Sequence, residues 1–279
     1  MESGAQAEID YSLYYRKWHD TSAAHAEATA AYYRGVAGPH LPERRDAALF
    51  DLGCGMGFTL LAYQGMGYRD CTGIDISREQ IQAARSQGLR VEQADDSAAW
   101  LEARPATYDF ISAFDVLEHI PRGELLRLVR AVHAALKPGG VFLCVTPNAN
   151  CAVAMRWRYN DWTHHTSFTE HSLDFVLRNG GFGTARIGEV NFFQRRPAHA
   201  WLPRKAVARW LLARFFRAWR RLQFAAEFGF AASRAIPLSL NIMGLARRAP
   251  AGGETGGGPD GRPAGKPGGG PGARPGPGL

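Results

Sequence analysis

The sequence predicts an α/β fold in which a doubly wound, mainly parallel sheet is covered by helices on both faces. Two observations support this expectation. Short apolar runs typical of buried strands alternate with helix-like segments from about 47 to 190, and the first run ends in a glycine turn followed by a helix start. The chain has 279 residues, 46% of them hydrophobic, which is enough to bury a sizeable core.

The boundaries of the expected elements follow from the sequence. Proline and glycine at 137–140 end one helix and turn the chain into the next strand, and Gly88 ends another helix. The polar and aromatic segment 149–168 is expected to be a loop over the carboxyl edge of the sheet. Strands are expected at 47–52, 71–76, 89–93, 108–114 and 141–146, with helices at 57–65, 78–87 and 122–136.

The strongest local signal is the sequence LFDLGCGMG at 49–57, which leads from a strand through a turn into a helix. Gly53, Gly55 and Gly57 allow positive φ angles and a close approach of the backbone to a ligand. In open α/β sheets, ligands bind beyond the carboxyl ends of the strands. The turn is therefore expected to form part of a cofactor site.

The spacing and charge of this turn distinguish between cofactors. The dinucleotide fingerprint requires a third glycine where this chain has Phe58, and a pyrophosphate would meet the carboxylate of Asp51 just before the turn. S-adenosylmethionine instead carries an ammonium and a sulfonium, and both favour a nearby carboxylate. We therefore expect S-adenosylmethionine as the cofactor, and an NAD-dependent oxidoreductase is disfavoured.

Further acidic residues follow the second and third strands. Asp75 ends an apolar run eighteen residues after the glycine turn, where a carboxylate can accept both ribose hydroxyls. Asp95 and Asp96 are expected near the adenine amino group, although either residue could instead be a turn or cap residue. The expected cofactor-binding residues are Asp51, Gly53, Gly55, Gly57, Asp75, Ile76, Asp95, Asp96 and Phe114.

Together with a Leu-Glu-His element at 117–119 and a Leu-Lys-Pro-Gly-Gly turn at 136–140, these motifs make 47–190 resemble the class I S-adenosylmethionine-dependent methyltransferases. The segment is most similar to the ubiquinone-biosynthesis-type branch and to bacterial relatives found with surface-glycan enzymes. The resemblance implies a Rossmann-like, seven-stranded sheet with an antiparallel last strand. Segments 185–190 and 240–247 would supply the final two strands.

The resemblance also raises the question of a metal ion. In the ubiquinone-type branch a metal site is described around the acid-x-x-Glu-His segment, and the matching positions here are Asp115, Glu118 and His119. The alternative interpretation is that Glu118 and His119 only shape the cofactor pocket and cap the next helix. Our prediction is that the site uses no metal.

The catalytic base is expected in the 149–168 segment. An oxygen nucleophile must lose its proton, and a histidine, with an ordinary pKa of about 6.5, is a natural base for this step. We predict that His164 or His165 takes this role, although each could simply hydrogen-bond the loop in place. Thr169 is expected to be a helix N-cap rather than a catalyst.

The same segment is expected to bind the methyl acceptor. Trp157 and Trp162 could stack on a sugar or an aromatic ring. Methyltransferases that act on adenine or cytosine amino groups have an Asn/Asp-Pro-Pro-aromatic segment after the fourth strand, where this chain has Phe-Asp-Val-Leu at 114–117. Oxygen is therefore the preferred acceptor atom.

Two flanking regions surround the methyltransferase domain, which is expected at 47–249. Residues 1–46 are expected to form an N-terminal helical lid, and the Gly/Pro-rich segment 250–279 is expected to be a disordered tail because it cannot form a core. The segment at about 195–235 is rich in arginine and has apolar residues at intervals of three or four, which predicts a basic amphipathic helix inserted between the last two strands.

Three interpretations of this basic insertion remain open: contact with an anionic membrane surface, binding of nucleic acid, or a solvated cap or dimer contact. Arginines interleaved with bulky aromatic residues favour the membrane surface and make nucleic acid the less favoured partner. The chain shows no secretory leader pattern and no apolar stretch that approaches a membrane span, so the expected location is cytoplasmic, with peripheral contact at the inner membrane face as an option. The four scattered cysteines are expected to be buried free thiols.

The expected function is O-methylation of a glycan, a lipid-linked molecule or another small-molecule acceptor by S-adenosylmethionine. One alternative is a ubiquinone-type phenolic O-methyltransferase, in which a metal ion would make activity sensitive to a chelator. The other alternative is a non-catalytic protein at a membrane, which would bind S-adenosylmethionine without turnover.

Overall fold

The computed structural model describes residues 23–190 and 204–251. Several expectations fall outside these ranges: the first part of the predicted N-terminal lid at 1–22, the first part of the basic insertion at 195–203, and the predicted disordered tail from 252 onward.

The sheet has seven strands in the order β3-β2-β1-β4-β5-β7-β6. The first five strands are mutually parallel where they pair, and β7 runs antiparallel to both β5 and β6. This is the predicted doubly wound sheet with an antiparallel last strand. The strands are β1 (Ala48–Leu52), β2 (Asp70–Asp75), β3 (Arg90–Gln93), β4 (Tyr108–Phe114), β5 (Leu136–Pro147), β6 (Ala185–Glu189) and β7 (Asn241–Arg247).

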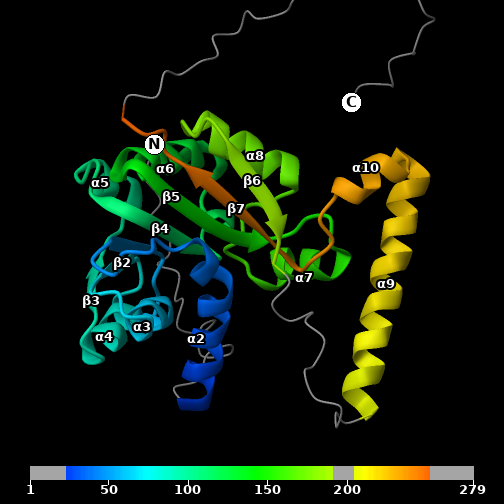
Figure 1. Ribbon diagram of the computed structural model, residues 1–279, viewed down its shortest axis with the longest axis horizontal. Helices are drawn as coiled ribbons and strands as arrows, with labels where there is room; N and C mark the ends of the chain where they lie inside the picture. The colour runs from blue at the N-terminus through cyan, green and yellow to red at the C-terminus, as the bar shows by residue number, and fades with distance from the viewer. Residues whose placement is uncertain (1–22, 191–203, 252–279) are drawn as a thin grey trace, which may run out of the picture.

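Helices cover the two faces of this sheet, and α9 stands beside it (Figure 1). Helices α5, α6 and α8 contribute to one apolar core, and α2, α3 and α4 contribute to the other. The helices are α2 (Ala23–Ala37), α3 (Phe58–Gly65), α4 (Arg78–Ser86), α5 (Ser97–Glu102), α6 (Arg122–Ala135), α7 (Ala152–Asn160), α8 (Glu170–Asn179), α9 (Arg204–Phe228) and α10 (Phe230–Ala235), with short 3-10 turns at Gly38–His40 and Leu117–His119.

Strand β1 shows how the sequence specifies two cores. All five of its residues are buried. Leu49 belongs to the core beneath α3, and its neighbour Phe50 belongs to the core beneath α6, because successive side chains of a strand point to opposite faces. A continuous apolar run is therefore the pattern of a strand that is covered on both sides.

Some elements differ from the sequence-based expectation. The 149–168 segment is not entirely a loop, because α7 occupies its first half, where Ala, Met and Arg are good helix formers. Strand β5 begins at Leu136, ahead of the Lys-Pro-Gly-Gly segment, because Leu136 already pairs with Tyr108 and the register then shifts before Phe110. Gly139 has a φ of 80° within this irregular stretch, which a residue with a side chain rarely adopts.

Candidate active site

A cavity of about 1050 Å³ opens at the carboxyl edge of the parallel strands. Its walls come from the ends of β2, β4 and β5, from the segments that follow them, and from Tyr32 and Tyr33 of α2. One end of the cavity contains the expected cofactor residues Asp75, Asp95 and Asp96, and the lining continues to Asp161 and His164. A cofactor and an acceptor could therefore share a single space.

The three glycines of the turn have different roles. Each has a positive φ, which is 69° at Gly53, 52° at Gly55 and 86° at Gly57. Only Gly53 lines the cavity. A Cβ atom on Gly57 would lie 2.1 Å from Cδ1 of Leu89, so this glycine lets the turn pack closely against the segment between α4 and β3. The backbone N–H of Gly55 donates to Asp75 and so fixes that side chain.

Asp75 is held in place by the backbone on both oxygens. Oδ2 accepts from the N–H of Gly55 at 2.9 Å, and Oδ1 accepts from the N–H of Ser77 at 2.8 Å. Burial nevertheless raises the pKa of this carboxyl above its ordinary value. Asp75 lines the cavity, and a carboxylate with two acceptor oxygens matches the two hydroxyls of a ribose.

Asp51 does not reach the cavity, contrary to the simplest interpretation of the glycine motif. Its side chain is buried inside the domain, where Oδ1 accepts from the hydroxyl of Ser112 at 2.6 Å. Burial raises the pKa of Asp51 to about 7. The charge of this residue can therefore act on a bound cofactor only from behind the turn.

The other expected cofactor residues, Ile76, Asp95, Asp96 and Phe114, all line the cavity. Asp96 is the N-cap of α5, since it accepts from the N–H of Ala99 at 2.9 Å, and it also pairs with Arg127 at 2.8 Å. Asp96 is thus the helix cap that the sequence offered as an alternative, and Asp95 is the better candidate for contact with an adenine amino group.

Tyr32 and Tyr33 of α2 form part of the cavity wall. From the sequence they were expected only to belong to the N-terminal helical lid, and not to line the site. The Tyr33 ring lies edge-on to Phe114 with centroids 4.7 Å apart, and Tyr32 packs against the same ring at 6.3 Å. Two adjacent aromatic residues in a helix are common in proteins, so the sequence did not identify them as site residues.

The acceptor end of the cavity contains buried polar atoms that lack partners among the described residues. Oε2 of Glu118 accepts from the hydroxyl of Thr146 at 3.1 Å, but Oε1 has no hydrogen-bond partner. Nδ1 of His164, a residue only 8% exposed, also has none. Unpaired buried polar atoms are rare in proteins, and their presence in a cavity indicates a place for a ligand.

Glu118, His119 and His164 are the described residues that could hold a metal ion. Each offers one ligand atom, and these atoms lie within 4.8 Å of one another. Burial raises the pKa of Glu118 well above its usual value and, together with the charge of His164, lowers the pKa of His119 to about 4. The family resemblance implied Asp115, Glu118 and His119 as possible ligands. In the structure the third member of the group is His164 and not Asp115.

Only one of the two predicted catalytic histidines lies in the cavity wall. His164 lines the cavity, whereas His165 is exposed and is absent from the cavity lining; its backbone N–H donates to the carbonyl of Glu118 at 2.7 Å. Likewise Trp157 lines the cavity, but Trp162 is 92% exposed. His165 and Trp162 are therefore outside the site that the structure forms.

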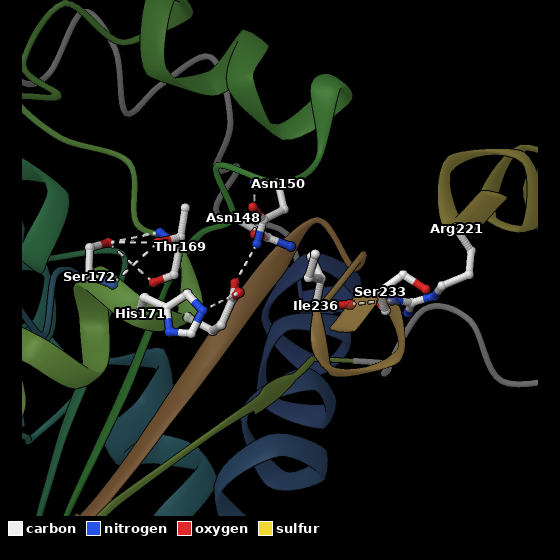
Figure 2. Close-up of polar contacts among 9 residues, drawn as sticks. Asn148, Asn150, Thr169, His171, Ser172, Arg221, Ser233 and Ile236 are labelled. Atoms are coloured by element: carbon white, nitrogen blue, oxygen red, sulfur yellow. Dashed lines mark hydrogen bonds and ion pairs between the residues drawn. The ribbon is translucent and has the colours of Figure 1, made fainter. Parts of the chain in front are cut away.

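The helix that follows this segment starts where the sequence predicted. Thr169 is the N-cap of α8, and its hydroxyl accepts from the N–H of Ser172 at 3.2 Å (Figure 2). Ser172 in turn accepts from the N–H of Thr169 at 2.9 Å, which completes a capping box. The expectation that Thr169 is a helix N-cap is confirmed.

A family model described as a methyltransferase domain matches residues 26–185. This match covers more than half of the chain and includes the glycine turn, Asp75 and the Glu118–His119 segment. The chain belongs to the methyltransferase-domain family. S-adenosylmethionine is the cofactor of this family, and the predicted family, fold class and cofactor are confirmed.

Curated relatives of this methyltransferase match over part of their length. A ubiquinone biosynthesis O-methyltransferase of Xanthomonas campestris pv. campestris is 33% identical over 110 residues, which is 37% of this chain and 44% of the relative. A protein of the same name from Ruegeria pomeroyi is 29% identical over 150 residues, which is 48% of this chain and 58% of the relative. The chain thus spans about half the length of these relatives.

The fold of the methyltransferase domain also has solved counterparts. The crystal structure of an S-adenosylmethionine-dependent methyltransferase from Archaeoglobus fulgidus superposes with a TM-score of 0.61 at 18% identity. The superposition covers 86% of this chain and all of that chain. This likeness supports the seven-stranded architecture.

Proposed function

We propose that this protein transfers a methyl group from S-adenosylmethionine to a hydroxyl oxygen of an uncharged small molecule, glycan or lipid-linked acceptor. One observation carries the proposal: a single cavity contains the cofactor-type carboxylate of Asp75 and, in its acceptor part, Glu118 Oε1 and His164 Nδ1, which have no hydrogen-bond partner within residues 23–190 and 204–251. A cofactor and a hydroxylated acceptor can therefore meet without rearrangement of the described chain.

The residues of the cavity fit S-adenosylmethionine. Asp75 would hold the ribose, Asp95 the adenine amino group, and Ile76 the flat face of the adenine, while Gly53 leaves room beside the turn. The acidic lining favours a ligand that carries an ammonium and a sulfonium. When bound, the cofactor supplies a methyl group on a positively charged sulfur, which keeps the electron pair of the broken C–S bond as the acceptor oxygen gains the methyl.

The charge of the lining supports an acceptor without a negative charge. Within the described part of the chain, Arg127 is the one lysine or arginine that lines the cavity, and it pairs with Asp96 at 2.8 Å. The acceptor end carries Asp115, Glu118 and Asp161 instead. A phosphate or carboxylate close to the reacting hydroxyl would have no lysine or arginine to pair with there, so the negative group of a lipid-linked acceptor would have to lie outside.

A phenolic acceptor with a metal ion is the second candidate function. It is supported by the cluster of Glu118, His119 and His164, and by the similarity to ubiquinone biosynthesis O-methyltransferases. A metal ion would lower the pKa of a phenolic hydroxyl and fix its position. This candidate predicts that a chelator abolishes turnover and that added divalent ions restore it, whereas the metal-free enzyme is indifferent to chelation.

The proposed activity is tested with methyl-labelled S-adenosylmethionine, using catechol and a solvent extract of bacterial membranes as separate acceptors. Label that moves to either acceptor in an oxygen-linked methyl group supports the proposal. Tight binding of S-adenosylhomocysteine without label transfer to either acceptor would contradict it and favour the non-catalytic alternative.

We also propose that α9 contacts an anionic membrane surface. Leu211, Phe215, Trp219 and Leu222 recur at intervals of three or four and are each more than half exposed, which gives an unburied apolar stripe. Glu227 is the only acidic residue in the sequence from 204 to 235, against many arginines. An apolar stripe beside dense positive charge is typical of helices that lie in a bilayer interface. No helix in the described parts of the chain is both long and apolar enough to cross a membrane.

Helix α9 is attached next to the cavity. Arg217 forms an ion pair with Glu189, and Arg221 donates to the carbonyls of Ser233 and Ile236 (Figure 2). Val190, which directly follows Glu189, lines the cavity. A membrane under α9 would therefore lie near the acceptor end, which suits an acceptor held in a lipid layer.

Flotation with vesicles tests this contact. Wild-type protein is expected to float with vesicles that contain phosphatidylglycerol but not with pure phosphatidylcholine, and Phe215→Glu is expected to stay at the bottom of the gradient. Phe175→Glu is a matched control, because Phe175 on α8 and Phe215 are both 62% exposed. Equal flotation of the two variants, or a concentration-dependent dimer in place of flotation, would overturn the membrane proposal.

A further inference from the structure

Three residues from two separate segments form a chain of hydrogen bonds at the acceptor end. Oδ1 of Asp161 accepts from the hydroxyl of Thr163 at 2.6 Å and from the N–H of Thr163 at 2.9 Å. The same hydroxyl oxygen lies 2.8 Å from Nδ1 of His119. Asp161 is 7% exposed, and both Asp161 and His119 line the cavity. The chain thus connects a buried carboxylate to an imidazole in the acceptor site.

The protons in this chain can be assigned from the chemistry of the groups. A carboxylate can only accept, so the single hydroxyl proton of Thr163 is donated to Asp161, and the short distance agrees with a charge-assisted hydrogen bond. The Thr163 oxygen must then accept from His119, which requires a proton on Nδ1. In a neutral imidazole the other nitrogen, Nε2, consequently carries the lone pair.

His164 has no comparable arrangement. Its Nε2 lies 3.6 Å from Oδ2 of Asp161, which is too long for a hydrogen bond, and its Nδ1 has no partner among the described residues. The rings of His119 and His164 meet edge-on with centroids 4.5 Å apart. Of the two neighbouring imidazoles, His119 is therefore the one with a hydrogen bond to a side chain that is itself held by a carboxylate.

We propose that Asp161 and Thr163 are positioning residues that hold His119 with its proton on Nδ1, so that Nε2 takes the proton of the acceptor hydroxyl during methyl transfer. The inference rests on the proposed O-methylation for its role in turnover, but not for the tautomer itself. The transfer is balanced: the new C–O bond replaces the C–S bond, the released pair stays on sulfur, and the hydroxyl proton passes to Nε2 and later to solvent. Fixing the tautomer matters because the opposite one would present an N–H to the hydroxyl and could not accept its proton.

The tautomer is measured directly by long-range proton–nitrogen correlation NMR on protein labelled at histidine nitrogens, with S-adenosylhomocysteine present. His119 signals are identified by their loss in His119→Gln. The wild-type protein and Thr163→Ser, which keeps the hydroxyl, are expected to show the proton on Nδ1. Thr163→Val, which removes the hydroxyl at nearly constant volume, is expected to show loss of this preference. A wild-type protein with the proton on Nε2 would refute the proposal without any variant.

Turnover provides the second readout, with catechol as the acceptor. Thr163→Val is expected to lower kcat by about 10- to 100-fold, with little change in KM for S-adenosylmethionine, and Thr163→Ser is expected to restore most of the rate. Unchanged kcat in Thr163→Val would overturn the positioning role. If chelation abolished turnover and zinc or magnesium restored it, Nε2 would be a metal ligand, and proton acceptance by His119 would be wrong.

The two proposals fail in distinguishable ways. If no acceptor is methylated while His119 keeps the Nδ1 proton, the proposed O-methylation fails and the tautomer assignment stands. If catechol is methylated but the tautomer is the opposite one, the function stands and the inference about Thr163 fails.

Discussion

At the scale of single residues, two aspartates at strand ends show how position decides the role of a carboxylate. Asp75 ends β2, is held by two backbone N–H groups and lines the cavity. Asp51 lies near the end of β1 and is turned into the domain toward Ser112. Both residues precede turns in the sequence, but their hydrogen-bond partners differ: Ser112 inside the domain for Asp51, and backbone N–H groups at the cavity edge for Asp75.

Replacing Asp75 is expected to weaken cofactor binding strongly. In Asp75→Asn, one ribose hydroxyl loses a charged acceptor and the amide adds an unmatched donor, so the affinity for S-adenosylhomocysteine should fall by about 10- to 100-fold. Isothermal titration calorimetry measures the change. Asp70→Asn at the other end of the same strand is the control, because Asp70 pairs with Arg90 on the surface. Equal affinities for Asp75→Asn and wild type would contradict the assignment of Asp75 to the ribose.

The cofactor side of the site was more predictable than the acceptor side for a physical reason. Asp75 and Phe114 end strands, and Ile76 and Asp95 come shortly after strand ends. Parallel strands bring their carboxyl ends to one edge, so these residues meet there. The hydrogen bond between His119 and Thr163 joins positions 44 residues apart whose side-chain directions depend on the path of the chain after α7. Neither the hydrophobic periodicity nor the spacing of motifs in the sequence predicts the path of the chain after α7.

At the scale of elements, the sequence pattern predicted the strands better than the segments that cover the site. The fourth strand has the predicted boundaries, because Tyr108–Phe114 is an apolar run between turns. Helix α7 was missed because nine residues of mixed polarity show little difference between a helix and a loop. Helix α5 was missed as well, since six residues are too few for a clear helical period.

The cap of α8 offers a test of an element whose start the sequence did predict. Thr169→Ala removes the hydroxyl that accepts from the N–H of Ser172, and it is expected to destabilise the protein by about 1 kcal/mol. Thr169→Ser keeps the hydroxyl and should be nearly neutral. Urea unfolding followed by circular dichroism provides the values. A loss of methyl transfer in Thr169→Ala at unchanged stability would contradict a purely structural role for Thr169.

At the scale of the whole molecule, buried titratable groups make stability depend on pH in two opposing ways. The folded-state pKa of Asp51 is about 7 against an ordinary 3.8, so the unfolded chain loses this proton first and stability falls as pH rises from about 4 to 7. His119 acts in the opposite direction. Its pKa is lowered from 6.5 to about 4, so the imidazole of the unfolded chain is protonated first as pH falls. Stability therefore decreases as pH drops from about 6.5 to 4.

The contribution of Asp51 can be isolated by substitution. Asp51→Asn cannot ionise and still offers an oxygen to Ser112, so its free energy of unfolding relative to wild type should rise by a few kcal/mol between pH 4 and pH 8. Urea titrations at a series of pH values give this difference. Asp46→Asn, whose side chain is 80% exposed, is the control. A difference for Asp51→Asn that does not vary with pH would show that Asp51 ionises as freely as a surface aspartate.

The position of β7 between β5 and β6 has a consequence for synthesis on the ribosome. Among the described strands, β6 pairs only with β7, and β7 follows β6 in the chain by way of α9 and α10. A nascent chain that has emerged through β6 therefore has the edge of β5 open and no strand for β6 to pair with. The sheet becomes complete only when Asn241–Arg247 leaves the exit tunnel. During that interval the apolar stripe of α9 and an unpaired strand edge are exposed together, and nascent protein at this length is expected to depend most on chaperones.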